Sequence, residues 1–387
     1  MFTNHRDISK LTKGQKTGNV LLQIARILLG CVFIFSGFVK AIDPLGSTYK
    51  FDDYFRAFGG AFEMFTHISF VMAVLLSTLE LVIGLSLIFK VQIRLTAIAA
   101  VAFMAVMTPL TLYIALKKDL VTDCGCFGDA LVISNWATFI KNLVFSSLAI
   151  LVLIYQTKFR SILTTKAQNI AFILFVVVGF GLSTYCYRNL PLIDFLPYKV
   201  GVNLPNAMLV PEGAKKDEYT TTFIYKKGDI QKEFTLENYP KGDSTWKFVD
   251  QKTVLVNEGY KAPIHDFTIV NAQFEDITED VLYNEGETYL LIISDVNNAS
   301  ADGARKAEVI YQKALASGQK FYALTASADA DIQNFIQQNK LTYPFCKTDG
   351  TALKTIIRAN PGIMLIKKGT IIGKWSWRNF GKVGSKE

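Results

Sequence analysis

The first half of the chain is dominated by apolar stretches of about 20 residues, the length that an α-helix needs to cross the hydrocarbon core of a bilayer. A removable signal peptide is the alternative for the first stretch. That stretch is long, begins late and has no small-x-small cleavage site before Lys40, so we interpret it as a retained helix. We therefore predict five membrane-spanning helices, at Val20–Val39, His67–Phe89, Leu95–Leu116, Trp136–Tyr155 and Asn169–Cys186.

The loops between these helices differ in their content of basic residues. The N-terminus and residues 90–94 and 156–168 together hold nine Lys or Arg and one acidic residue. Residues 40–66 and 117–135 together hold five Lys or Arg and seven acidic residues. Loops rich in Lys and Arg remain cytoplasmic, so we predict a cytoplasmic N-terminus. Five crossings then place everything after Cys186 in the periplasm, for a chain in the inner membrane of a bacterial cell.

The net charge of +8 belongs almost entirely to the membrane half. Residues 1–186 hold 16 Lys and Arg against 9 Asp and Glu, while residues 187–387 hold 25 against 24. The second half has no basic stripe with interleaved aromatic residues. We therefore expect the lipid bilayer as a partner and no nucleic acid.

Aromatic residues recur at roughly helical spacing in the loop 40–66. This pattern predicts an amphipathic helix, which either lies on the membrane surface or covers the mouth of the helix bundle. The residues are Tyr49, Phe51, Tyr54, Phe55, Phe58, Phe62 and Phe65.

Two ionisable residues, Arg26 and Glu80, fall inside the first two predicted spans. Their depths are expected to differ by roughly 5 Å at the helical rise per residue. An isolated charge in the bilayer is costly, so we expect the two side chains to pair. The pair either fixes the register of the two helices or forms a proton or quinone site, in which Arg26 and Glu80 would be the cofactor-binding residues.

Two of the five cysteines form the sequence Cys124-Gly125-Cys126 in a loop predicted to be periplasmic. Cysteines at this spacing can close a very small disulfide ring, for which Gly125 supplies backbone freedom. A strained, exposed disulfide exchanges readily, and the periplasm permits an oxidised state. Cys186 is the best-placed third thiol, whereas Cys31 and Cys346 are interpreted as buried free thiols.

Three roles for the Cys124–Cys126 pair stay open. The first is thiol–disulfide exchange, with Cys124, Cys126 and Cys186 as catalytic residues. The second is structural, such as a bridge to Cys186. The third, metal binding, needs further ligands that the three histidines do not supply near this loop, so no metal is expected.

The membrane half resembles the DoxX/MauE family over about residues 20–156. The resemblance rests on the segment Arg26–Asp43, on Glu80 with Gly84, and on the CGCFGD sequence at Cys124–Asp129. It implies a four-helix membrane bundle. MauE members of the family are linked to the maturation of disulfide-containing periplasmic proteins, and some DoxX members are subunits of quinone-linked oxidoreductases. The resemblance thus implies a membrane quinone as cofactor and a periplasmic thiol-containing protein as client.

Residues 187–262 read as a β-rich segment. Tyr219–Tyr225 and Ile230–Thr235 alternate around a Lys-Gly-Asp turn and predict a hairpin. Trp246–Val249 and Thr253–Val256 predict a second hairpin.

From residue 263 onward, strands alternate with helices, which predicts an α/β sheet covered on both faces. The expected strands are Phe267–Val270, Tyr289–Ser294, Phe321–Ala326, Gly362–Lys367 and Ile371–Trp375, and the expected helices are Ala301–Ser317, Asp329–Gln338 and Ala352–Arg358.

This order resembles the thioredoxin-like fold over about residues 263–378, with Asn360-Pro361 at the position of its cis-proline. Redox-active members carry Cys-x-x-Cys directly after the strand that corresponds to Tyr289–Ser294. Residues 295–301 contain no cysteine, so the domain lacks the thiolate that dithiol exchange needs.

Two functions are therefore weighed. In the first, the protein is a thiol–disulfide oxidoreductase component that acts through Cys124 and Cys126, with the redox-inactive domain holding a client. In the second, the protein is a non-catalytic membrane-anchored scaffold or binding module whose cysteines are structural. Transport ranks lower, because the spans show no repeated pair of broken helices.

Overall fold

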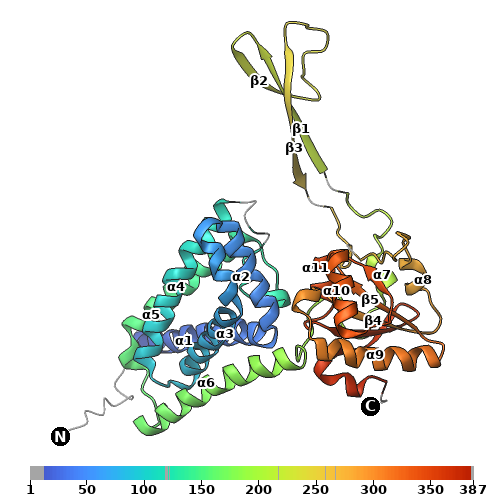
Figure 1. Cartoon of the computed structure of the whole chain (residues 1–387). Coiled ribbons are helices and arrows are strands. Elements are labelled where there is room, and N and C mark those ends of the chain that lie inside the picture. Colours follow the sequence, from blue (N-terminus) through green and yellow to red (C-terminus); the bar gives the residue numbers. More distant parts are fainter. Residues whose placement is uncertain are drawn as a thin grey trace.

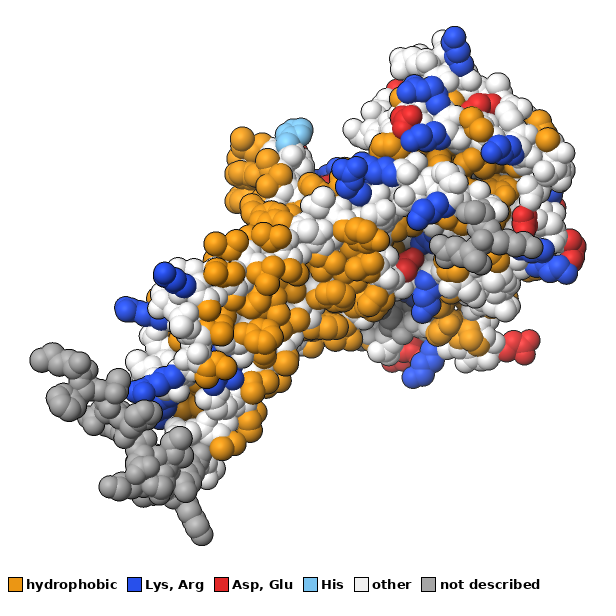
Figure 2. Space-filling view, turned by 90° about the horizontal axis from the view of Figure 1, so that it is seen from below, with side chains coloured by type: hydrophobic (Ala, Val, Ile, Leu, Met, Phe, Trp, Pro, Cys, Tyr) orange, Lys and Arg blue, Asp and Glu red, His pale blue; other side chains and the backbone are white. Residues whose placement is uncertain are grey.

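The computed structural model describes residues 13–117, 121, 123–216, 218–257, 259–265 and 267–384. Its N-terminal half is a bundle of helices, and five segments of that bundle are long and apolar enough to cross a membrane, which confirms the five predicted spans (Figure 1). Figure 2 shows hydrophobic side chains gathered along this helical body and a mixed surface over the other half. The spanning helices are α1 (Lys13–Ile42), α3 (Ser69–Phe89), α4 (Ile93–Leu116), α5 (Asn135–Ile154) and α6 (Thr165–Arg188).

Helices α1 and α3 pack backbone to backbone through glycines. A Cβ atom on Gly37 would lie 2.6 Å from the backbone nitrogen of Leu81, and one on Gly84 would lie 2.6 Å from that of Ile34. Small residues at such crossings let membrane helices approach closely. The contacts fix an antiparallel register in which Gly37 lies opposite Leu81 and Ile34 opposite Gly84.

The predicted pair between Arg26 and Glu80 is wrong, because this register separates them. The guanidinium of Arg26 donates to the backbone carbonyls of Leu87 and Ile88, the latter at 2.9 Å, near the end of α3. Glu80 lies opposite Lys40, which is roughly 21 Å further along α1 at the helical rise per residue. The prediction failed because α1 runs past Val39 to Ile42 and so includes Lys40, which the sequence had placed in a loop.

The loop 40–66 is helical, as its aromatic spacing predicted. It forms α2 (Pro44–Phe58), capped by the Asp43 carboxylate that accepts from the backbone nitrogen of Gly46, and the 3-10 helix η2 (Gly60–Ile68). Helix α2 packs on α3 and contacts the loop that carries Cys124 and Cys126. Of the two placements considered, the cover over one end of the bundle is therefore favoured.

The C-terminal half is an α/β domain built on a five-stranded sheet in the order β6-β5-β4-β7-β8. Strands β4, β5 and β6 are parallel, whereas β7 is antiparallel to β4 and β8 to β7. The Asn360–Pro361 peptide bond that precedes β7 is cis, as the thioredoxin-like resemblance implied. The strands are β4 (Glu287–Ile293), β5 (Lys320–Thr325), β6 (Phe345–Lys347), β7 (Gly362–Lys367) and β8 (Thr370–Ser376).

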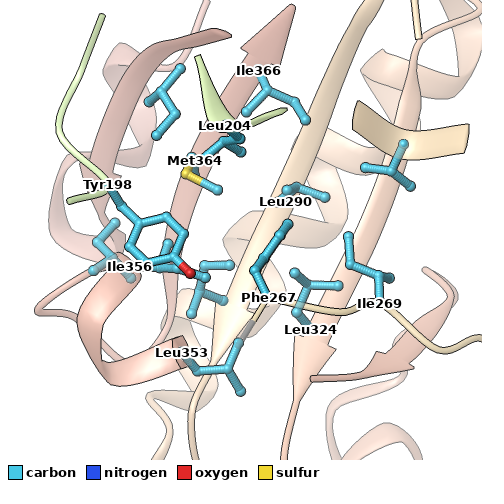
Figure 3. Packing of buried hydrophobic residues seen from close by; sticks show 14 of the residues in the cluster. Tyr198, Leu204, Phe267, Ile269, Leu290, Leu324, Leu353, Ile356, Met364 and Ile366 are labelled. Carbon is cyan, nitrogen blue, oxygen red and sulfur yellow. The ribbon is translucent and has the colours of Figure 1, made fainter. Parts of the chain in front are cut away.

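Alternation along β4 divides the core between the two faces of the sheet. Leu290 and Ile292 point to one face, beneath α7 (Leu204–Met208), α8 (Thr278–Leu282) and α11 (Gly350–Ile356) (Figure 3). Leu291 and Ile293 point to the other face, beneath α9 (Ala301–Ala316) and α10 (Asp329–Asn339). The predicted sheet with helices on both faces is confirmed.

Two predicted strand assignments in this half are wrong. Residues Phe267–Val270 form only an isolated bridge at Val270, although Phe267 and Ile269 are buried in the core. The second hairpin is one continuous strand, β3 (Lys247–Asn257), which pairs with β1 (Glu218–Lys227). With β2 (Ile230–Thr235) it forms a three-stranded sheet that projects away from the rest of the molecule (Figure 1).

The α/β domain is docked on the helix bundle through Arg358, directly after α11. Its guanidinium contacts both carboxylate oxygens of Asp43, at 3.0 and 2.9 Å, and the Asp129 carboxylate at 2.9 Å. It also lies over the ring of Tyr49, 5.5 Å from the centroid, and only 7% of its side chain is exposed. Because Asp129 lies three residues after Cys126, the docking site adjoins the cysteine loop.

Replacing Arg358 by Gln is expected to loosen this interface, because two carboxylates would then face each other without a cation. We expect a cost of roughly 1–3 kcal/mol, lower than for a fully buried pair because Asp129 is partly exposed. Hydrogen–deuterium exchange should rise over residues 123–130 relative to the wild type. The exposed Lys367 of the same domain, changed to Gln, is the control. Equal exchange over residues 123–130 in the two variants would contradict the docking role of Arg358.

Candidate functional site

The two cysteines of the loop between α4 and α5 lie side by side. The sulfurs of Cys124 and Cys126 are 3.0 Å apart, both are free thiols, and the residues are 7% and 8% exposed. Gly125 between them has φ of +62°, a conformation that favours glycine. The loop therefore holds two thiols within exchange distance, as the spacing had predicted.

A buried ammonium group ties this loop to the bundle. Lys40 Nζ donates to the Cys126 carbonyl oxygen at 2.6 Å and to Ser36 Oγ at 2.7 Å, and pairs with both oxygens of the Glu80 carboxylate at 3.0 and 2.9 Å. The Ser36 hydroxyl donates to the same carbonyl at 2.7 Å. Lys40 is 6% exposed and Glu80 is 2% exposed, so the charges stabilise each other rather than being solvated.

Helix α2 holds the loop from the other side. Lys50 pairs with the Asp123 carboxylate at 2.7 Å, and the other oxygen of that carboxylate accepts from the Gly125 backbone nitrogen. The Tyr54 hydroxyl donates to the Cys124 carbonyl oxygen at 2.6 Å, and burial raises its pKa, so it stays a donor. The carbonyl groups of Cys124 and Cys126 are thus both held by hydrogen bonds from helix side chains.

The two thiols differ in acidity. A hydrogen bond from Cys124 lowers the pKa of Cys126, with help from the nearby ammonium groups of Lys141 and Lys40 and against the effect of burial. The same hydrogen bond, together with burial, raises the pKa of Cys124. Lys141 lies 4.2 Å from the centroid of the Phe127 ring, next to Cys126. Cys126 is therefore the more acidic thiol of the pair, and the thiolate is the nucleophilic form of cysteine.

A cavity of about 630 Å³ adjoins the cysteines on the bundle side. Its walls come from α1, α2, η2, α3, α4, the cysteine loop and residues 191–196, which follow α6. Asp194 in that last segment pairs with Lys374 of β8 at 2.7 Å, so the α/β domain also holds one wall in place. The lining is mainly apolar, and it includes Lys40 and both cysteines.

The other predicted site residues lie apart from this centre. Arg26 does not line the cavity, so its expected role in cofactor binding finds no support in the geometry. Cys186 is buried at the end of α6 and forms no disulfide. Cys31 is exposed on α1, contrary to the expected burial, whereas Cys346 is buried as expected. The catalytic role of Cys124 and Cys126 remains a prediction.

Several residues of the site were missed from the sequence. Lys40 was assigned to a loop and Lys141 was given no role, so neither was linked to the cysteines. The sequence offered one signal for Lys40. Ser36 lies four residues earlier, so the two polar side chains would share one face if the helix continued through Lys40. Arg358 carried no signal, because its two carboxylate partners lie in the other half of the chain.

The lowered pKa of Cys126 predicts a distinct pH profile for alkylation. Because the thiolate is the reactive form, Cys126 should react with a small permeant alkylating reagent at lower pH than an ordinary thiol, whose pKa is about 8.5, and at lower pH than Cys124. Changing Lys141 to Met should move the Cys126 profile to higher pH. Peptide-resolved mass spectrometry separates the two sites, and identical profiles in wild type and variant would contradict the assignment.

The membrane half matches a known family. Residues 18–155 match the family model described as methylamine utilisation protein MauE, and residues 219–258 match a domain of unknown function. No curated protein matches the chain significantly. A solution structure from Bacteroides thetaiotaomicron, described as a candidate protein disulfide isomerase, is similar at 18% identity and a TM-score of 0.25, over 30% of this chain and 76% of that one. The MauE match covers the segment that contains Lys40, Glu80 and both loop cysteines.

Proposed function

We propose that the chain is a membrane thiol–disulfide exchange protein that acts in the maturation of disulfide-containing proteins on the periplasmic side of the bacterial inner membrane. The observation that carries the proposal is the Cys124–Cys126 pair, whose sulfurs are 3.0 Å apart and whose pKa values are shifted in opposite directions. Perturbed thiols of this kind are typical of exchange sites. The MauE match supports the same class of function.

The exchange step starts from the Cys124–Cys126 disulfide. A client thiolate attacks Cys124 and forms a mixed disulfide, while Cys126 leaves as the thiolate. Cys126 is the better leaving group because its pKa is lowered. A second client thiolate then attacks the mixed disulfide and releases Cys124. The client has lost two electrons and gained an S–S bond, and the chain holds two reduced thiols.

The α/β domain serves this reaction without a thiol pair of its own. Residues 295–301 contain no cysteine, and Cys346 is buried. Its Arg358 side chain, which pairs with Asp129, lies beside the cysteine loop. The domain is therefore assigned to holding the client near Cys124 and Cys126.

A scaffold function is the second candidate. The observation in its favour is that both loop cysteines are less than a tenth exposed. In that case the thiols stabilise the loop and exchange with nothing.

Changing Cys124 and Cys126 together to Ser distinguishes the two functions. The full chain in lipid nanodiscs is oxidised, desalted and mixed with reduced, unfolded ribonuclease A. The wild type should remove about two thiols from that probe per chain, because one disulfide is passed on, and the double variant should remove none.

Changing Cys31 and Cys346 to Ser is the matched control, and this variant should remove as many thiols from the probe as the wild type does. Cys186→Ser, made separately, should also keep it, because Cys186 forms no disulfide with the pair. Equal thiol loss with the wild type and the Cys124/Cys126 variant, or none with either, would reject exchange in favour of the scaffold.

A further inference from the structure

We propose that the end of α6 and the 3-10 helix η6 (Trp377–Lys382) together bind the headgroups of anionic phospholipids, so that the α/β domain rests on the membrane surface. The site lies apart from the cysteine pair, and the proposal does not depend on thiol exchange. Both segments lie outside the two family matches.

The length of α6 places its last residues at the surface of the bilayer. The helix has 24 residues and ends at Arg188. It rises about 36 Å, whereas the hydrocarbon core of a bilayer is about 30 Å thick. Tyr185 and Tyr187 near its end are 53% and 37% exposed, and tyrosine is enriched at the membrane–water interface. Tyr187 and Arg188 therefore lie at the level of the phospholipid headgroups.

Hydrogen bonds fasten η6 to this end of α6. Asn379 Nδ2 donates to Asn189 Oδ1 at 3.0 Å, and the Ser376 hydroxyl donates to the Arg188 carbonyl oxygen at 3.3 Å. The segment is thus held beside the residues where α6 leaves the membrane. Figure 2 shows that the hydrophobic surface of the bundle gives way to charged side chains where the other half begins.

The guanidinium of Arg378 is held at this junction by two aromatic rings. Its central carbon lies 4.3 Å from the centroid of the Trp377 ring and 5.4 Å from that of Tyr187. Stacking of this kind uses the flat face of a guanidinium and leaves its N–H donors available at the edge. Arg378 is therefore oriented and still able to bind an anion.

The cations at this junction differ from those that fasten the domain to the bundle. Arg358 pairs with Asp43 and Asp129, and Lys374 pairs with Asp194. Within the ranges that the structure describes, neither Arg188 nor Arg378 has a carboxylate partner. Two positive charges thus lie at the headgroup level without a compensating acid from those ranges.

The chemistry of these side chains identifies the ligand as a phospholipid headgroup. Guanidinium N–H groups match the oxygens of a phosphate group, and Lys and Arg near a bilayer are attracted to anionic lipids. The rings of Tyr187 and Trp377 are the kind of aromatic side chain that lies among headgroups. A zwitterionic headgroup carries a cation of its own, so the two arginines favour an anionic headgroup such as phosphatidylglycerol.

Photocrosslinking in nanodiscs tests the site. The full chain is placed in phosphatidylcholine nanodiscs that contain a small fraction of phosphatidylglycerol with a photoreactive headgroup, or of a phosphatidylcholine probe of matching design. We expect the phosphatidylglycerol probe to label the peptides that hold residues 185–189 and 377–382 more than the phosphatidylcholine probe does. Arg188→Gln and Arg378→Gln should each lower that labelling roughly fivefold, the factor expected for one basic residue near an anionic membrane.

Two further variants separate the charge from other effects. Arg378→Lys should keep most of the labelling, because it keeps the charge while changing the contact with Tyr187. Lys313→Gln removes the same charge elsewhere in the domain and should label like the wild type. Lys313 is exposed in the last turn of α9, about 15 Å along that helix from Gly303, which packs against Trp377.

Three results would overturn the headgroup site. The first is equal labelling by the phosphatidylglycerol and phosphatidylcholine probes, and the second is labelling that maps to other peptides. The third is an equal decrease in the Lys313→Gln and Arg378→Gln variants, which would show an effect of net charge alone.

Discussion

The arrangement of the site depends on one buried ammonium group. Lys40 Nζ has three protons, and they are directed to the Glu80 carboxylate, Ser36 Oγ and the Cys126 carbonyl oxygen. An uncompensated charge at this depth would be costly, so α1, α3 and the cysteine loop must meet at this point for the charge to be stabilised. The close contact of α1 and α3 through Gly37 and Gly84 brings the two charges to the same level.

The loop that results is held between two environments. On the bundle side it borders a mainly apolar cavity, and on the other side Arg358 of the α/β domain binds Asp43 and Asp129 next to it. Under the proposed function, the α/β domain, which lacks a Cys-x-x-Cys pair, positions the client, and the Cys124–Cys126 pair of the membrane half carries out the exchange.

The sequence predicted the elements of this molecule better than their contacts. Helix and strand patterns depend on local periodicity, so the five spans, the sheet with two covered faces and the Cys-Gly-Cys loop could be recognised. The partner of Glu80 could not, because it depends on the register of two helices, and a shift of a few turns exchanges Lys40 for Arg26. Short or irregular segments also failed: β6 has only three residues, and Phe267–Val270 is buried without forming a strand.

The redox state of Cys124 and Cys126 in native membranes tests the central claim most directly. Acid trapping, followed by thiol labelling with a mass tag, counts reduced cysteines before mild reduction, after it and after reoxidation. The account predicts that two tags appear on the Cys124–Cys126 peptide after reduction and disappear on reoxidation, while Cys31, Cys186 and Cys346 do not change. A peptide that stays reduced under all three conditions, or stays oxidised despite the reductant, would contradict reversible exchange at this loop.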